Sequence, residues 1–309
     1  MNIMKNLIFI FLILLPASVF SQKSKHEKDT NQGFEFFFNA GMYLGNKHNA
    51  NYYSGDPFQD PDPTKRDYAD PNIWYVWNNR YLREDIKNLI DVNHRDVIMD
   101  TAWLDCVSEM RYNLAFAFGI GARYRFSESF TMSFLFSQMG LTADGVASFG
   151  VKGTGVNLDK DIKYLNYKVT GKERRIFLEM NISYLFETIY PYVFPFVELG
   201  VHVNNVKVLK SELIVEERAF SMINMYGEGT IYDPSINQPI INPYLGGVGF
   251  GFMGGLGIRL AVGKWAAIEP VIQVSTEKLN LSSYGKMRPN YHFIIRLVAS
   301  DKIFMKKQE

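Results

Sequence analysis

The chain has 309 residues with 33 basic and 32 acidic side chains, a length that suits one large domain or two small ones. The nearly balanced charge and the lack of a basic tract argue against nucleic acid as a partner. The one cysteine, Cys106, excludes an intramolecular disulfide and has no evident partner for thiol chemistry.

The first 21 residues have the pattern of a secretory signal peptide. Lys5 supplies a short positive region, Leu7 to Leu15 form an apolar core, and Val19 to Ser21 form a small-residue exit. The apolar run is shorter than the roughly 20 residues that a spanning helix needs. We therefore expect cleavage near Ser21, export of the chain, and a short periplasmic segment at residues 22–33.

Eight segments alternate apolar and polar residues with a period of two, which predicts β-strands with one apolar face. In the second segment Phe116, Phe118 and Ile120 share one face, whereas Gly119 and Arg123 share the other. In chain order the segments span residues 34–45, 111–126, 130–142, 174–187, 192–205, 249–262, 265–277 and 287–299.

Short and long connections alternate between these segments. The short ones are residues 127–129, 188–191 and 263–264, and the others are residues 46–110, 143–173, 206–248 and 278–286. A tight turn at every second connection makes consecutive strands antiparallel hairpins. Short turns at one end and long loops at the other are typical of outer-membrane barrels, whose sheet closes because lipid tolerates no unpaired strand edge.

The sequence therefore predicts an all-β protein, a transmembrane antiparallel up-and-down β-barrel of about eight strands over residues 34–299, followed by a tail at 300–309. Further strands at residues 162–170 or 206–216 would raise the count to 10 or 12. A soluble β-sandwich or barrel also alternates. Its polar face would carry solvated Lys and Glu, whereas the polar face here is rich in Gly, Ala and Ser.

Three stretches resemble small outer-membrane β-barrel proteins of the eight-strand type, and more narrowly those of Bacteroidota. They are the first strand FEFFFNAGMYLG, the last strand YHFIIRLVA, and Phe-Ser-Gln at residues 20–22. The resemblance implies a location in the outer membrane of a Gram-negative bacterium. The chain departs from the family pattern because DKIFMKKQE follows its last strand in place of a terminal aromatic residue.

Charged residues on the inward faces form the main candidate site. An eight-strand barrel has an interior just wide enough for side chains to fill, and a charge enclosed there must be paired. We therefore predict an Arg/Glu network that plugs the lumen, with a gate or narrow ion path as the alternative. Its predicted members are Glu35, Arg111, Arg123, Arg125, Arg175, Glu179, Glu187, Glu198, Arg259, Glu269 and Arg296.

Two other chemistries have weaker signals. His202 with Glu198, and His292 near the upper end of the last segment, could serve a lipid A-modifying enzyme, but neither lies in a recognisable Ser-containing motif. We therefore favour structural histidines and predict no catalytic residue. The aspartates at 56, 60, 62, 67 and 70 could supply oxygens to calcium, but they lack the required spacing, so no metal and no cofactor is predicted.

The first long loop contains its own helical pattern. Leu82, Ile86 and Leu89 recur at helical spacing, which predicts a short helix after a group of aromatic residues. A long loop with such a stripe is rarely structureless, so it either folds over the barrel mouth or presents a docking surface. The candidate partner-binding residues are Trp74, Tyr75, Trp77, Leu82, Ile86 and Leu89.

These features favour a non-enzymatic outer-membrane protein that acts as a structural or accessory subunit of an envelope complex, such as a secretion or translocation machine. Its expected partners are outer-membrane lipid and other outer-membrane or secretion-complex proteins. The alternatives are a narrow porin-like channel and a lipid A-modifying enzyme.

Overall fold

The computed structural model describes residues 33–56, 70–94, 97–154, 162–190, 192–223, 245–262, 266–282 and 284–300. The chain divides into two compact units, Met1–Asn31 and Gln32–Glu309, and the described residues all belong to the second. The predicted signal peptide, nearly all of the periplasmic segment and most of the tail lie outside the described residues.

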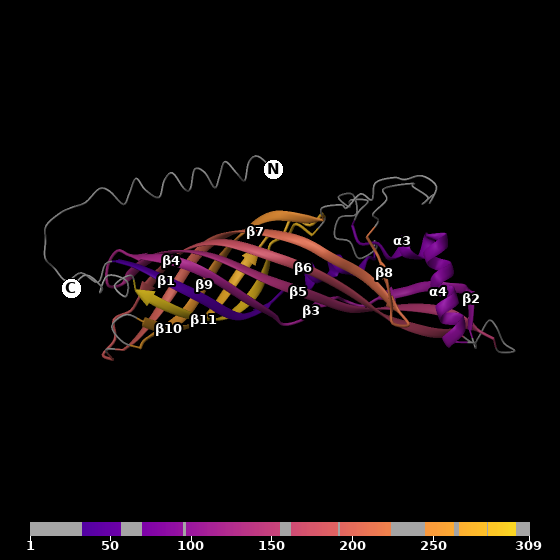
Figure 1. Ribbon diagram of the computed structural model, residues 1–309, viewed down its shortest axis with the longest axis horizontal. Helices are drawn as coiled ribbons and strands as arrows, with labels where there is room; N and C mark the ends of the chain where they lie inside the picture. Colours follow the sequence, from indigo (N-terminus) through magenta and orange to yellow (C-terminus); the bar gives the residue numbers. More distant parts are fainter. Residues whose placement is uncertain are drawn as a thin grey trace, which may run out of the picture. The chain divides into compact units, whose positions relative to one another are not determined.

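Eight antiparallel strands of the described chain close into a barrel (Figure 1). They are β1 (Gly33–Leu44), β4 (Ala115–Arg125), β5 (Phe130–Gly153), β6 (Ile162–Leu185), β7 (Val193–Val215), β9 (Gly246–Ala261), β10 (Ala266–Glu277) and β11 (Arg288–Ser300). Each strand pairs with the next along the chain, and β1 pairs with β11, so no strand of this ring has a free edge. The predicted fold class is confirmed.

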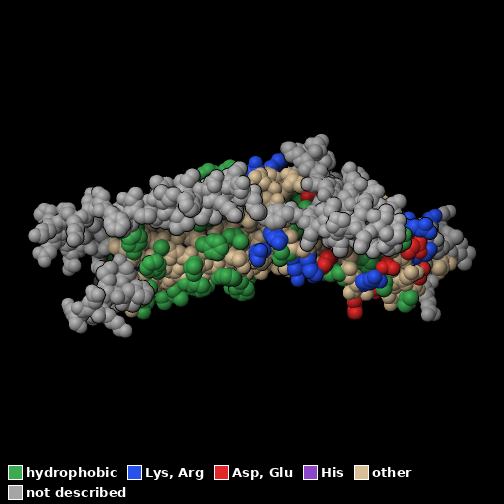
Figure 2. All heavy atoms as spheres, turned by 45° about the horizontal axis from the view of Figure 1, so that its top comes forward, with side chains coloured by type: hydrophobic (Ala, Val, Ile, Leu, Met, Phe, Trp, Pro, Cys, Tyr) green, Lys and Arg blue, Asp and Glu red, His purple; other side chains and the backbone are tan. Residues whose placement is uncertain are grey.

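The barrel wall is apolar outside and polar inside, the reverse of a soluble protein. On β1, Phe36 and Phe38 are 50% and 43% exposed, whereas Glu35 before them and Asn39 after them are 6% and 4% exposed. The same alternation continues around the ring, and Figure 2 shows hydrophobic side chains gathered over a band of the wall. An exposed apolar band around a closed barrel is stable in lipid, so the ring spans the outer membrane.

Three of these strands run far past the apolar band. β5 and β6 have 24 residues each and β7 has 23, about twice the 9–11 residues that a tilted strand needs to cross a bilayer. β2 (Val97–Val107) pairs with β5, and β8 (Arg218–Ser221) pairs with β7. The extension is therefore a sheet in the order β2-β5-β6-β7-β8.

This extension corrects the prediction that residues 143–173 and 206–248 are loops. The stretches at 162–170 and 206–215 are strands, as the alternative with extra strands required. They continue β6 and β7, however, and add no strand to the ring, so the number of barrel strands in the described residues stays at eight. Much of the third long connection, residues 224–244, lies outside the described residues.

Helices cover one side of the extension. These are α2 (Lys47–Ala50), the 3₁₀ helix η1 (Asn51–Ser54), α3 (Ile73–Asn78) and α4 (Arg80–Asn93). We call the helices and the extended parts of β2, β5, β6, β7 and β8 the headpiece. Of the helices in the described ranges, none combines the length and the apolarity needed to span a bilayer.

The short helix predicted in the first loop is α4. It begins after Asn79, whose side chain accepts hydrogen bonds from the backbone N–H groups of Tyr81 and Leu82 and so caps the helix. Ile86 and Ile90 are both 1% exposed, because they lie four residues apart on the face that packs inward. The N-cap and the apolar stripe thus fix where α4 starts and which way it faces.

The headpiece has its own apolar core, which is larger than any apolar cluster inside the barrel. Trp77 of α3 stacks on Phe149 of β5 with ring centroids 4.9 Å apart. Val169 of β6 and Leu213 of β7 are fully buried against the same cluster. The sheet and the helices therefore fold as one body above the membrane band.

Candidate functional site

A network of ion pairs fills the barrel interior near the short-turn end. Arg123 donates to Glu269 over 2.6 Å, and Arg259 bridges Glu35 at 2.6 Å and Glu269 at 3.1 Å. Arg296 pairs with Glu198 at 3.1 Å. We call this set the lower network, and its members are Glu35, Arg123, Arg125, Glu198, Arg259, Glu269 and Arg296.

Every strand of the ring except β5 and β6 contributes to the lower network, because each sends alternate side chains inward. Arg123 and Arg296 also lie over the ring of Phe37, at 5.3 and 5.1 Å from its centroid. Arg296 is 1% exposed and Glu269 is fully buried. Charges this deep in the protein are tolerated only when paired and hydrogen-bonded, and the lower network supplies that pairing across the lumen.

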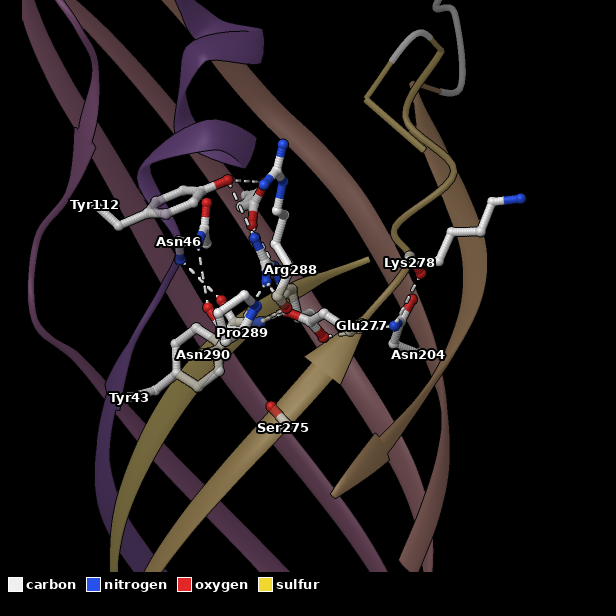
Figure 3. A network of polar contacts seen from close by, with 12 residues as sticks. Tyr43, Asn46, Tyr112, Asn204, Ser275, Glu277, Lys278, Arg288, Pro289 and Asn290 are labelled. Atoms are coloured by element: carbon white, nitrogen blue, oxygen red, sulfur yellow. Dashed lines mark hydrogen bonds and ion pairs between the residues drawn. The ribbon is translucent and has the colours of Figure 1, made fainter. Parts of the chain in front are cut away.

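A second network closes the lumen at the headpiece end (Figure 3). Arg175 of β6 pairs with Glu277 at 2.5 Å and also with Glu173, and it donates to the hydroxyl groups of Tyr43 at 2.7 Å and Tyr112 at 3.1 Å. We call this set the upper network.

Figure 3 shows how the carboxylate of Glu277 is held in this network. Tyr43 and Asn290 donate to Glu277 at 2.6 and 2.8 Å, while Asn204 donates to the backbone carbonyl of Lys278 at 3.2 Å. Arg175, Glu173 and Glu277 all have fully buried side chains. The upper network is therefore a second closed layer in series with the lower one.

Between the two networks lies a layer of weakly paired polar groups. Ser137 donates to Glu179 over 3.0 Å, and the hydroxyl of Ser275 lies 3.2 Å from the Nε2 atom of His292. His202 is 3.8 Å from Glu277, beyond hydrogen-bond distance. A cavity of about 20 Å³ touches Glu179 and His292, which is room for roughly one water molecule. The middle layer therefore has room for a water molecule beside Glu179 and His292.

Nine of the eleven residues predicted for the lumen network lie inside the barrel. Seven form the lower network, Arg175 belongs to the upper network, and Glu179 lies between them. The prediction was wrong for Arg111 and Glu187, both of which are exposed.

The errors have local causes. Glu187 follows the end of β6 at Leu185. Arg111 lies in the two-residue strand β3 (Arg111–Tyr112), which residues 113 and 114 separate from β4. This break shifts the alternation by one position, so Tyr112 points inward to Arg175 and Arg111 points out.

Sequence analysis missed most of the upper network. Glu277 stands on the polar face of the seventh segment, so its position in the alternation was a usable signal. Glu173 and Tyr53 lie in stretches expected to be loops, yet Tyr53 donates to Glu173 inside the protein. Tyr43 makes its polar contacts with Arg175 and Glu277 through its hydroxyl group, and a count of hydrophobic residues includes tyrosine as apolar.

The six candidate partner-binding residues hold the headpiece together. Trp77 and Ile86 are buried in the headpiece core, and Trp74, Tyr75, Leu82 and Leu89 are half-buried against it. Trp77 and Ile86 are therefore not available as a docking surface, whereas partner binding by the four half-buried residues stays a prediction. The remaining exposed apolar residues of α4 are Tyr81 and Val92.

The remaining candidates are the two histidines, the aspartates and Cys106. His202 and His292 are both buried in the lumen. Asp70 accepts a hydrogen bond from Tyr52 at 2.8 Å, whereas Asp60, Asp62 and Asp67 lie outside the described residues. Within the described ranges no group of three or more possible ligands could hold a metal ion. Cys106 is exposed and unpaired.

Comparisons with known proteins found similar solved structures but no matching family. No protein-family model matches the chain, and no curated protein is recognisably similar in sequence. The solved structure of Neisserial surface protein A aligns over 86% of this chain and 96% of its own, with 7% identity and a TM-score of 0.37. The outer membrane protein OprG from Pseudomonas aeruginosa aligns over 88% and 95%, with 8% identity and a TM-score of 0.33. These scores are too low to carry an argument, so the barrel assignment rests on the closed sheet and its apolar exterior.

Proposed function

We propose that this protein is a sealed, non-enzymatic outer-membrane anchor whose headpiece serves as a structural or accessory subunit of an envelope complex. The observation that carries the proposal is the combination of a lumen closed by two charged layers with a separately cored headpiece built on the same strands. Long connections of outer-membrane barrels face outward, so the headpiece would stand on the extracellular side.

The lumen favours an anchor over a channel. An ion would have to pass both the lower and the upper network, and each contains a fully or almost fully buried arginine, Arg296 and Arg175. Breaking either pair would leave an uncompensated charge in the interior, which costs several kcal/mol. A conducting state therefore has a large energetic barrier.

The positions of the histidines favour a non-enzymatic anchor over a lipid-modifying enzyme. Ser275 and His292 are close enough to share a proton, but they are 2% and 6% exposed inside the barrel. A lipid substrate would reach the outer rim of the wall, whereas this pair lies behind it. The Ser275–His292 pair is therefore out of a lipid's reach, which supports a non-enzymatic role.

The headpiece offers a protein partner exposed apolar side chains outside the membrane band. Tyr81 and Val92 on α4 are 60% and 72% exposed, and Tyr164 on the far part of β6 is 56% exposed. Tyrosines of this kind supply contact area at low conformational cost and are enriched at interfaces. We expect them to form part of a contact surface in the assembled envelope.

Site-specific photo-crosslinking in native membranes tests the proposal. A photoreactive residue at Tyr81 or Tyr164 is expected to give discrete protein adducts, while the same residue at the lipid-facing Leu199 or Ile272 is the matched control. Planar-bilayer recordings of the same preparation are expected to show no conductance. Headpiece positions that crosslink no more than the lipid-facing controls, or a steady conductance, would refute the proposal.

A further inference from the structure

A group of basic side chains lies on the outer wall directly above the apolar band. Along the outward face of β6, Leu178 and Ile176 are followed by Arg174 and Lys172. Along the outward face of β7, Val203 is followed by Asn205, Lys207 and Lys210. We call Lys172, Arg174, Lys207 and Lys210 the basic patch, and all four are exposed. Figure 2 shows Lys and Arg side chains gathered at the edge of the hydrophobic band.

The pairing of the two strands places like charges directly opposite each other. Arg174 faces Lys207, and Lys172 faces Lys210, in the antiparallel register of β6 and β7. Side chains in such positions have Cβ atoms roughly 4.5–5.5 Å apart, and like charges there destabilise a sheet. An external anion bound between these two pairs would reduce the repulsion within each of them.

Carboxylates of the described chain neutralise only part of this charge. Lys210 pairs with Glu212 at 3.1 Å, and the neighbouring Lys168 pairs with Asp144 at 3.0 Å. Among the described residues no ion pair is recorded for Lys172, Arg174 or Lys207. Three cations therefore lie on one side of the barrel rim with no acidic partner among the described residues.

The neighbouring strands leave space beside these cations. On β5, Gly140 faces Arg174 and Thr142 faces Lys172. A Cβ atom added at Gly140 would meet nothing nearer than the Glu173 carbonyl at 4.0 Å. On β9, Gly246 faces Lys207. A bulky polar group could therefore reach the basic patch from the β5 side.

We propose that the basic patch binds the phosphate of an anionic lipid headgroup in the leaflet on the headpiece side. The patch stands where the apolar band ends, which is the level of the headgroups, and the acyl chains of the same lipid would lie along Ile176, Leu178 and Val203. Lys and Arg near a membrane surface attract anionic lipids, and the planar Arg174 guanidinium can hold two phosphate oxygens at once.

Thermal unfolding of the full chain in nanodiscs tests the proposal. The probe is phosphatidylglycerol mixed into phosphatidylcholine, compared with phosphatidylcholine alone. The wild-type protein is expected to unfold several degrees higher in the anionic discs. The variant Lys172→Gln/Arg174→Gln/Lys207→Gln is expected to lose that increase and to be at least as stable as wild type in the neutral discs, because its cross-strand repulsion is gone.

Native mass spectrometry of the same samples supplies a second measurement. Three cations near an anionic surface contribute enough that their loss should weaken retention of phosphatidylglycerol roughly a hundredfold. The matched control is Lys47→Gln/Arg83→Gln/Arg218→Gln, which removes three headpiece cations; Lys47 and Arg218 there are paired with Glu109 and Asp85. This control should keep both the stabilisation and the lipid.

Two results would overturn the assignment. Equal stabilisation of wild type and the patch variant by anionic discs would show that the basic patch is not the binding site. Inorganic phosphate added to neutral discs at the same ionic strength distinguishes the source of the anion. If it stabilised the wild type as much as phosphatidylglycerol does, the site would bind dissolved phosphate and the lipid assignment would fall.

Discussion

The lower and upper halves of β6 show the same backbone in two opposite environments. In the lower half, Glu179 and Asn181 face inward while Leu178 and Ile182 face lipid. In the upper half, Tyr167 and Val169 face inward while Lys168 faces water. Odd-numbered residues point inward throughout, so the strand geometry never changes. What inverts is the chemistry, because the medium outside changes from lipid to water between the two halves.

The two halves are also stabilised by different interactions. The lumen depends on buried ion pairs, which do little for net stability but are costly to break one at a time. The headpiece depends on apolar burial, in which losses scale with the volume removed. Substitutions of the two kinds should therefore differ in size and in how far their effects spread.

The largest effect is expected from Arg175→Met in the upper network. The change leaves Glu173 and Glu277 buried without a cation, so the free energy of unfolding should fall by about 3–5 kcal/mol. Urea unfolding in detergent, followed by the mobility of the folded barrel on gels, measures this loss.

A double variant distinguishes charge from packing in that experiment. Arg175→Met combined with Glu277→Gln removes one of the two stranded carboxylates and should recover part of the loss. A double variant as unstable as the single one would mean that Arg175 acts by filling space. The upper network would then be stabilised by packing, as the headpiece is, and not by ion pairs.

A smaller and more local effect is expected in the headpiece. Ile86→Ala should cost about 2–4 kcal/mol of local stability, because Ile86 is 1% exposed in the core under α4. Limited proteolysis should then cut α4 faster while the barrel keeps its folded mobility on gels. Val92→Ala, at a position 72% exposed, is the control and should change neither measurement. Unfolding of the barrel together with α4 would show that the two halves form one cooperative unit.

The alternation of residues was enough to predict the ring. All eight expected segments became barrel strands, because each strand has one face in lipid and the other in a polar lumen, so its pattern has the period of the backbone. The headpiece was not predictable in the same way. Its strands reverse the pattern of the same chain, and residues 143–153 and 162–173 therefore looked like interruptions.

Shifts of alternation also limit what the sequence can predict. In the pairing of β6 with β7, Lys172 faces Lys210 but Glu173 faces Val208, so Leu209 is an extra residue. Below this bulge the inward residues of β7 are even-numbered, and above it they are odd-numbered. A bulge carries no residue-type signature strong enough to be seen in one sequence. The break before β4 likewise shifts the alternation, and this is why the predicted directions of Tyr112 and Arg111 were wrong.

An alkaline pH-dependent effect is expected in the headpiece half of the comparison. Burial, together with the nearby Glu216 carboxylate, raises the pKa of Tyr167 above its usual value. A raised folded-state pKa gives stability that is complete below the unfolded value of about 10 and is lost as pH rises above it. Headpiece stability should therefore fall in alkaline buffer.

Tyr167→Phe isolates this contribution, because it removes the ionisable group and keeps the ring. Proteolysis rates of wild type and variant, measured as pH rises from neutral to strongly alkaline, should diverge above pH about 10, with the variant losing less. Parallel curves would contradict the assignment of the alkaline loss to Tyr167.

The smallest effect concerns the turn at the edge of the headpiece sheet. Glu216 and Glu217 connect β7 to β8 with φ values of 46° and 70°, the left-handed region that costs a residue with a Cβ atom about 1–2 kcal/mol. Both central residues of a type I′ hairpin turn adopt such angles, which is why glycine is favoured there. Glu216 lies 3.1 Å from His94 and so has a contact to lose, whereas no ion pair is recorded for Glu217 among the described residues.

Glu217→Gly should therefore stabilise the headpiece by about 1 kcal/mol, since the relief of strain exceeds the greater freedom of glycine in the unfolded chain. Slower proteolysis near β8 measures the gain, with the barrel again unaffected. Glu217→Ala is the matched control, because it removes the same charge and keeps the Cβ atom. If alanine stabilised the turn as much as glycine, the gain would come from charge removal. Backbone strain at Glu217 would then make no measurable contribution to the stability of the headpiece.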